Sequence, residues 1–291
     1  MKPVIKWTAL ALAACLPLSA QAHRAWMLPS ATVLSGEEPW ITVDAAVSND
    51  LFYFEHVPMR LKGIGDAAQA PAGGPPGMRA RPAPELQIIA PDGSKVSAQN
   101  GAVGRYRSTF DVQLSQKGTY KLAVANNGLF ASWKENGQPR RWMGSAEGFA
   151  KDVPAKAEGL KVSQNSSRME VFVTSGAPTR SVLEPTGQGL ELKPLTHPND
   201  LFAGEPAEFV FLLDGKPAAG VEISVIPGGN RYRDELGEIK ASTDAAGKVS
   251  ITWPQAGMYW LTAEYTTREG VRKPASERRA SYSATLEVLA P

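Results

Sequence analysis

The chain has 291 residues, with 31 Lys and Arg against 29 Asp and Glu, and its formal net charge is +2. A nearly neutral chain without a basic cluster lacks the electrostatic footprint of nucleic-acid-binding proteins, so nucleic-acid partners are excluded. The length is sufficient for two domains of ~100–150 residues, each with its own core.

Residues 1–22 have the pattern of a secretory signal peptide. Two lysines lie in the first six residues, residues 8–20 are apolar, and a small-x-small motif ends at Ala22. The apolar run is shorter than the ~20 residues of a membrane-spanning helix, and no later segment approaches that length. We therefore expect a periplasmic mature chain that begins at His23 and has no transmembrane segment.

A lipoprotein signal is the alternative for the same leader. Residues 12–15 match a bacterial lipobox, which would place a lipid on Cys15 and leave His23 inside the chain. The apolar run before Cys15 is shorter than the run before Ala22, which favours cleavage after Ala22. That cleavage removes the only cysteine, so any metal must bind nitrogen and oxygen donors.

Short apolar runs bounded by Gly, Pro, Asn and Asp predict an all-β chain with two immunoglobulin-like β-sandwich domains. Residues 23–185 are expected to form an elaborated β-sandwich, and residues 190–291 a compact one. Residues 65–84 are rich in Gly and Pro and predict a long disordered loop. Residues 130–143 are expected to be irregular or partly helical. The predicted strands lie in residues 30–56, 86–89, 106–114, 118–124, 169–174, 190–195, 208–213, 221–226, 249–253, 257–265 and 282–288.

The chain has three histidines, and they are the candidate metal ligands: His23, His56 and His197. A histidine at a free amino terminus offers both its imidazole and its α-amine, whose unperturbed pKa is ~7.7–8.0. His56 alternates onto the same face as Phe52 and Phe54, which suits either a packed core residue or a ligand with apolar surroundings. His197 precedes a proline, and this stiff segment suits either a ligand or an ordinary domain connection.

We expect the fold to bring the three histidines to one metal site, with Asp44 and Asp200 orienting an imidazole or adding an oxygen donor. Imidazole binds nickel, cobalt, copper and zinc, so the ligand type does not select one of these metals. No catalytic residue is predicted, because Gly144–Gly148 lacks the spacing of a nucleophile elbow and no other nucleophile is placed with a base.

Five motifs resemble a family of bacterial periplasmic proteins, a domain of unknown function that is often labelled the periplasmic component of a cobalt/nickel-type ABC uptake system. They are Ala22-His23, Trp26-x-x-Pro29-Ser30, residues 43–50, Phe52-x-Phe54-Glu55-His56 and His197-Pro198-Asn199-Asp200. The resemblance covers nearly all of the mature chain and implies metal handling at a site with all three histidines. Residues 215–221 and 243–248 resemble a transthyretin-like, carboxypeptidase-regulatory-type immunoglobulin fold, which implies a structural role for that half.

The expected function is therefore capture or delivery of nickel, cobalt or copper in the periplasm, with an inner-membrane transporter or an outer-membrane receptor as the partner. Two alternatives remain. A copper-dependent oxidative enzyme with a terminal-histidine site would show peroxide turnover on a polysaccharide or a small phenol. A non-catalytic envelope accessory or interaction module would fold without metal and copurify with an envelope protein.

Overall fold

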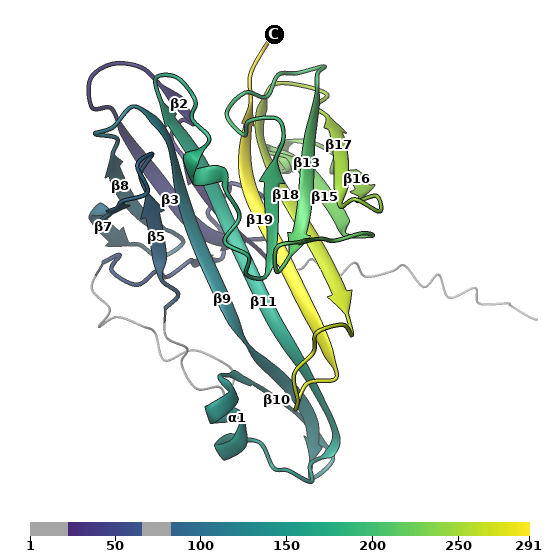
Figure 1. The fold of residues 1–291 in the computed structure, drawn as a ribbon. Helices are drawn as coiled ribbons and strands as arrows, with labels where there is room; N and C mark the ends of the chain where they lie inside the picture. The colour runs from purple at the N-terminus through teal and green to yellow at the C-terminus, as the bar shows by residue number, and fades with distance from the viewer. Residues whose placement is uncertain (1–22, 66–82) are drawn as a thin grey trace, which may run out of the picture.

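The computed structural model describes residues 23–65 and 83–291, and within them the all-β prediction is confirmed. The described chain forms three sheets and one short α-helix (Figure 1), with two 3₁₀ helices at Ser181–Leu183 and Asn230–Tyr232. No helix in the described part of the chain has both the length and the apolar character needed to cross a membrane. The predicted signal peptide at 1–22, the lipobox at Cys15 and most of the predicted loop at 65–84 lie outside the described residues.

The strands fall into a five-stranded, a ten-stranded and a four-stranded sheet. The five-stranded sheet contains β1 (Arg24–Pro29), β3 (Trp40–Ser48), β8 (Ser108–Gln113) and β7 (Gln99–Val103), with β4 (Val57–Pro58) paired to β3. The ten-stranded sheet contains β16 (Ile239–Ser242), β15 (Glu222–Pro227), β18 (Gly257–Thr267), β19 (Glu277–Val288), β11 (Glu158–Ser175), β9 (Gly118–Glu135), β5 (Leu86–Ile89) and β6 (Lys95–Val96), with β10 (Gln138–Gly144) on β9 and β2 (Val33–Leu34) on β11. The four-stranded sheet contains β12 (Leu190–Pro194), β13 (Pro206–Leu213), β14 (Lys216–Pro217) and β17 (Lys248–Thr252).

Two hydrophobic cores lie on adjoining halves of the ten-stranded sheet and on its opposite faces, because Val171 of the first core pairs with Thr285 and not with Tyr282 or Ala284 of the second. The five-stranded sheet packs on the β5–β9–β11 half and buries Phe110 and Tyr120 between the layers. The four-stranded sheet packs on the β15–β18–β19 half and buries Phe209, Phe211 and Tyr259. Each fully buried aromatic side chain contributes about 1.5–3 kcal/mol through its removal from water. The two β-sandwiches therefore share one continuous sheet (Figure 1).

The parallel pairing of β11 with β19 joins the two halves. The register runs from Ser163↔Glu277 to Val171↔Thr285, in a sheet whose other strand pairs are antiparallel within the described residues, except for the short contact of β2 with β11. Successive side chains of these strands point to opposite faces. Tyr282 and Ala284 of β19 therefore face the second core, while Ser281 and Ser283 lie on the opposite, open face together with Ser167 of β11, which pairs with Ser281. The serines of this open face line a cavity.

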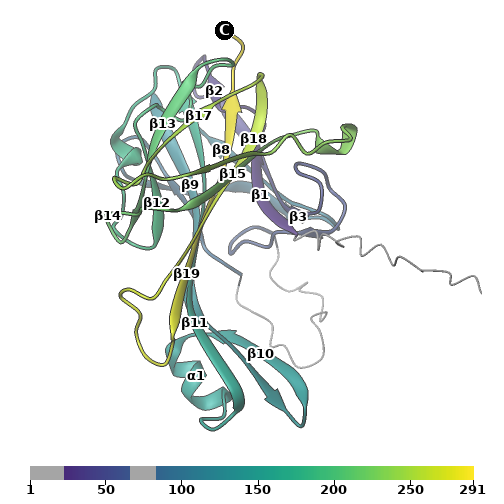
Figure 2. The same cartoon turned by 90° about the vertical axis from the view of Figure 1, so that its right-hand side faces the viewer.

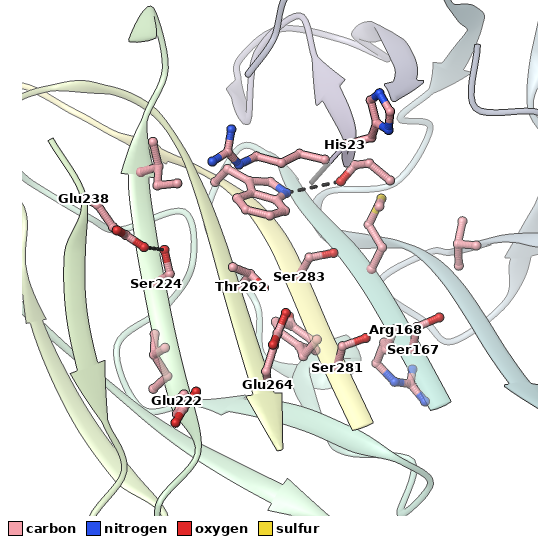
Figure 3. A pocket seen from close by; sticks show the side chains of 18 of the residues that line it. His23, Ser167, Arg168, Glu222, Ser224, Glu238, Thr262, Glu264, Ser281 and Ser283 are labelled. Carbon is pink, nitrogen blue, oxygen red and sulfur yellow. Dashed lines mark hydrogen bonds between the residues drawn. The ribbon is translucent and has the colours of Figure 1, made fainter. Parts of the chain in front are cut away.

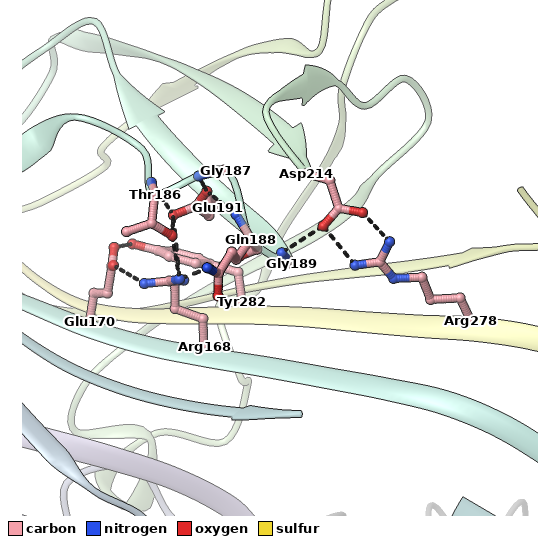
Figure 4. Close-up of polar contacts among 10 residues, drawn as sticks. All are labelled: Arg168, Glu170, Thr186, Gly187, Gln188, Gly189, Glu191, Asp214, Arg278 and Tyr282. Atoms are coloured by element: carbon pink, nitrogen blue, oxygen red, sulfur yellow. Dashed lines mark hydrogen bonds and ion pairs between the residues drawn. The ribbon is translucent and has the colours of Figure 1, made fainter. Parts of the chain in front are cut away.

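A buried ionic network also connects the two halves (Figure 4). Arg168 Nη1 lies 3.2 Å from Glu170 Oε1, and Arg168 Nη2 lies 3.4 Å from Glu191 Oε1. Tyr282 donates a 2.9 Å hydrogen bond to Glu170, while Glu191 also accepts from the backbone amides of 186–188. Burial, together with the charge of Glu170, raises the pKa of Tyr282 well above its ordinary value, so this phenol stays protonated and donates.

The structure differs from prediction over residues 130–143, which form a β-hairpin rather than an irregular or helical segment. The strands β9 and β10 continue into an arm that carries the helix α1 (Ala146–Asp152) at its end (Figure 2). The turn residues Asn136 and Gly137 have φ of 52° and 74°, as a type I′ hairpin turn requires. Trp142 packs edge-on against Phe149 of the helix at 5.7 Å, which explains the aromatic residues in this polar segment.

Candidate functional site

The sheet itself brings His23 and His56 together. Strands β1 and β4 pair with opposite edges of β3, so that Ala25 and Val57 both lie opposite Val47. His23 immediately precedes β1 and His56 immediately precedes β4. Because both strands run antiparallel to β3, the two histidines enter the sheet at the same end. This convergence depends on pairing between distant parts of the chain.

The two imidazole rings are stacked. Their centroids lie 4.0 Å apart and their planes differ by 5°. Both side chains are exposed. The ring lone pairs lie in the ring planes, so parallel rings do not point at one common ion. Convergence of the two rings on one ion therefore requires rotation about their side-chain bonds.

The residues before His56 form a packed loop, not the strand predicted for 51–56. Phe52 has a φ of 60°, which is a turn conformation and breaks the expected alternation. The rings of Phe52 and Phe54 both pack against Trp26 of β1, with centroid distances of 5.5 Å. Trp26 is fully buried and donates from Nε1 to Ser48 Oγ at 2.8 Å. The aromatic cluster thus attaches the His56 loop to the strand that begins after His23.

Polar contacts hold the same loop from two further directions. The Glu55 carboxylate accepts hydrogen bonds from the backbone amides of Asn49 and Asp50 at 2.7 and 3.1 Å. Burial opposes ionisation of Glu55, but these amide donors and the charge of Arg231 keep its pKa below the ordinary value. Asn230 of the second sandwich accepts from the amide of Leu51 at 2.9 Å. These contacts fix the backbone conformation next to His56, although the ring of His56 is exposed.

Asp44 does not contact an imidazole. It lies on β3 and forms a 3.3 Å ion pair with Arg107, whose guanidinium lies 4.4 Å above the ring of Phe54. Asp44 thus supports the aromatic cluster beneath the His56 loop. Its connection to the histidine pair passes through Arg107 and Phe54, which is more indirect than the orienting or ligating role that the sequence suggested.

His197 lies elsewhere and is buried. Its Nε2 lies 3.1 Å from both the carbonyl oxygen of Thr179 and Thr119 Oγ1, and its Nδ1 accepts from the amide of Asn199 at 3.0 Å. Burial lowers the pKa of His197 below its ordinary value, with the Thr179 hydrogen bond opposing the shift, so the ring is neutral near pH 7. The backbone amide of Asp200 donates to the His197 carbonyl at 3.0 Å, and the charge of its carboxylate opposes the lowering of the His197 pKa.

His197 and the stacked pair lie near different positions along the strand β9. His197 contacts Thr119 near the start of β9, whereas His23 lines a cavity that also includes Val124, five residues further along the same strand. At ~3.3 Å per residue, these β9 positions are roughly 17 Å apart. Among the described residues, no group of three or more His, Cys, Asp or Glu side chains is arranged to hold a metal ion. The structure therefore brings two of the three expected ligands together and uses the third in a hydrogen-bond network.

His23 also lies at the edge of a cavity of about 820 Å³ on the open face of the ten-stranded sheet (Figure 3). Trp260 lies beside it, and its Nε1 donates to the carbonyl of Ala25 at 3.2 Å. The guanidinium of Arg24 lies 5.8 Å from the ring of Trp260. This cavity was not expected from the sequence. The alternating polar residues of β18 and β19 were its only signal.

The comparisons with known proteins give a family and distant structural neighbours. Residues 20–267 match the model of a family described as a domain of unknown function (DUF4198). No curated protein matches. Among solved structures, the D0–D1 domain of intimin is 11% identical with a TM-score of 0.21, over 90% of this chain and 97% of that chain.

Two other structural neighbours are equally distant. Escherichia coli alpha-2-macroglobulin activated by porcine elastase is 10% identical with a TM-score of 0.20, over 90% of this chain and 31% of that chain. The FN1–FN3 domains of chicken CNTN1 are 6% identical with a TM-score of 0.22, over 92% of this chain and 99% of that chain. Similarity at this level assigns no activity to the present chain.

Proposed function

This chain belongs to the DUF4198 family, whose function is unknown, and we propose that it is an exported protein that binds one divalent transition-metal ion through His23 and His56. The observation that supports the proposal is the stacking of these two imidazoles at 4.0 Å, at the point where β1 and β4 enter the same sheet. Both rings are exposed, so their nitrogens are accessible to an incoming ion.

The third ligand in this proposal is the α-amine of His23. Cleavage of the predicted leader after Ala22 creates this amine, and its unperturbed pKa of ~7.7–8.0 makes deprotonation by a metal easy near neutral pH. Two imidazoles and one amine form an all-nitrogen donor set. The Irving–Williams order then predicts that Cu²⁺ binds more tightly than Ni²⁺, Co²⁺ or Zn²⁺.

The proposed role is capture and delivery of the ion in the periplasm. The backbone around the pair is well positioned by Trp26 and by Glu55, whereas the imidazoles themselves are exposed. An exposed site allows direct transfer of the ion to a partner, for which an inner-membrane transporter or an outer-membrane receptor is proposed.

Calorimetric titration of the mature protein with Cu²⁺, Ni²⁺, Co²⁺ and Zn²⁺ tests the proposal. One ion should bind per chain, with Cu²⁺ tightest. His56→Ala should weaken Cu²⁺ binding by more than about 100-fold, because the loss of a direct ligand exceeds the 10–100-fold effect of losing a supporting hydrogen bond. A form with one glycine before His23 should lose affinity in the same way. Absence of binding by the wild-type protein, or equal binding by all three forms, contradicts the proposal.

A further inference from the structure

A long polar groove crosses the open face of the ten-stranded sheet. Two adjoining cavities, of about 820 and 840 Å³, share four lining residues: Asn126, Ser167, Glu264 and Ser281. The groove passes over β18, β19, β11 and β9, with His23 at one end and Arg279 toward the other. The lining of its first half also includes Met59 of the first sandwich and Lys240 of β16; Figure 3 shows the labelled floor residues Thr262, Ser281 and Ser283.

Small hydrogen-bonding side chains form the floor of the groove. They come from alternate positions whose neighbours lie in the core: Thr262 lies between the buried Leu261 and Ala263, and Ser281 and Ser283 flank the buried Tyr282. Within the described part of the chain, none of the following side chains makes a hydrogen bond: Asn126, Ser167, Thr262, Ser281 and Ser283. Their hydroxyl and amide groups are thus available, as donors and as acceptors, to a ligand.

Three charged side chains of the groove form no ion pair with a described residue: Glu222, Glu264 and Arg24. Glu222 and Glu264 lie directly opposite each other on β15 and β18, a like-charged pair that is unfavourable in a sheet. Neither carboxylate forms an ion pair with a described residue. The cations of the groove already have partners. Lys240 pairs with Glu238 at 3.4 Å and Arg279 with Glu277 at 2.7 Å, while Arg24 donates to the carbonyl of Asn49 at 2.7 Å and lies over the ring of Trp260. This charge pattern disfavours anionic chains and favours a neutral ligand that donates hydrogen bonds to carboxylates.

We propose that the groove binds a neutral carbohydrate chain, which lies across β18, β19 and β11 and reaches His23 with one end. A polyhydroxylated chain matches the floor, because each sugar hydroxyl both donates and accepts hydrogen bonds. A peptide added as a strand needs unpaired backbone groups at a sheet edge, whereas this floor is a sheet face and offers only side chains. The inference depends on the groove alone and stands without the metal site.

Calorimetry on metal-free mature protein, with EDTA present, tests the inference with cellohexaose, chitohexaose and xylohexaose, and with hexagalacturonate as an anionic comparison. At least one neutral hexasaccharide should bind, and hexagalacturonate should bind at least about tenfold more weakly. Absence of binding by all three neutral hexasaccharides overturns the inference, and so does preferential binding of hexagalacturonate.

Two matched pairs of variants locate the binding. Ser167→Trp fills the groove where the two cavities meet and should abolish binding, whereas Ser250→Trp places the same side chain on the exposed side of β17 and should not affect it. Thr262→Val removes one floor hydroxyl and should weaken binding about 3- to 10-fold, with the exposed Thr252→Val as its control. Equal binding by the members of both pairs contradicts the placement. Circular dichroism verifies folding, and Cu²⁺ titration of Ser167→Trp reports separately on the metal site.

Discussion

Replacing His197 by alanine distinguishes a structural histidine from a metal ligand. The ring of His197 is buried and uses both nitrogens, so its removal leaves the buried amide of Asn199 and the half-buried carbonyl of Thr179 without this partner. Thr119 Oγ1 keeps other contacts, to Thr174 Oγ1 and to the amide of Thr179, each at 2.9 Å. The loss is therefore confined to two hydrogen-bonding groups and the volume of the ring.

The buried amide left unpaired costs about 1–3 kcal/mol, and the lost partner of the half-buried carbonyl and the lost packing of the ring add to it, so His197→Ala should lower the free energy of unfolding by about 2–5 kcal/mol. For a chain of this size, that corresponds to a decrease in Tm of roughly 5–15 °C. Urea denaturation followed by far-ultraviolet circular dichroism measures the loss. Cu²⁺ calorimetry at a temperature where the variant is folded should still show one ion per chain with wild-type affinity.

The opposite pair of results would refute this reasoning. If His197→Ala kept the wild-type free energy of unfolding within about 0.5 kcal/mol and lost Cu²⁺ binding, His197 would be a ligand and the hydrogen bonds assigned to its ring would have no role in stability. His56→Ala is the matched comparison, because His56 is exposed: it should leave stability nearly unchanged and abolish tight Cu²⁺ binding.

Three further predictions follow from the same contacts. Because burial lowers the pKa of His197, the unfolded chain takes up a proton before the folded chain does; the urea midpoint of the wild type should therefore decrease as pH falls below ~6.5, and His197→Gln should lose this part of the pH dependence. Tyr282→Phe removes the donor to the buried Glu170 carboxylate and should cost about 1–3 kcal/mol in urea denaturation, a loss that Tyr232→Phe on the exposed surface should not produce. Glu55→Gln weakens the acceptor that holds the amides of Asn49 and Asp50 and should reduce Cu²⁺ affinity about tenfold in calorimetry; unchanged affinity would show that this loop does not position His56.

Local patterns predicted most of the strands because each core-facing residue alternates with an exposed one. The strand predicted at 118–124 lies within β9, but β9 continues to Glu135. The extension was not predicted because the outer part of β9 packs on the helix α1 and not on either main core. Its sequence therefore mixes tryptophan with charged residues and lacks a clear alternation. The signal for the hairpin was present as Asn136-Gly137, a dipeptide typical of a two-residue turn.

The shared sheet could not be read from the sequence. Parallel pairing of β11 with β19 joins segments that are far apart along the chain. The local pattern of each strand predicts only that it belongs to a sandwich in its own half of the chain. The candidate site shows the same limit. His23 and His56 come together because β1 and β4 both pair with β3, whereas the proline after His197 suggested a projecting ring where the fold has a buried one.

The metal proposal rests on a new amino terminus at His23 that acts together with His56, and native mass spectrometry of the exported protein tests both parts at once. The account predicts a chain that begins at His23 and carries one metal ion, and a His56→Ala chain of matching length that carries none. A lipid on Cys15, a different first residue, or an ion retained by the His56→Ala chain would contradict it.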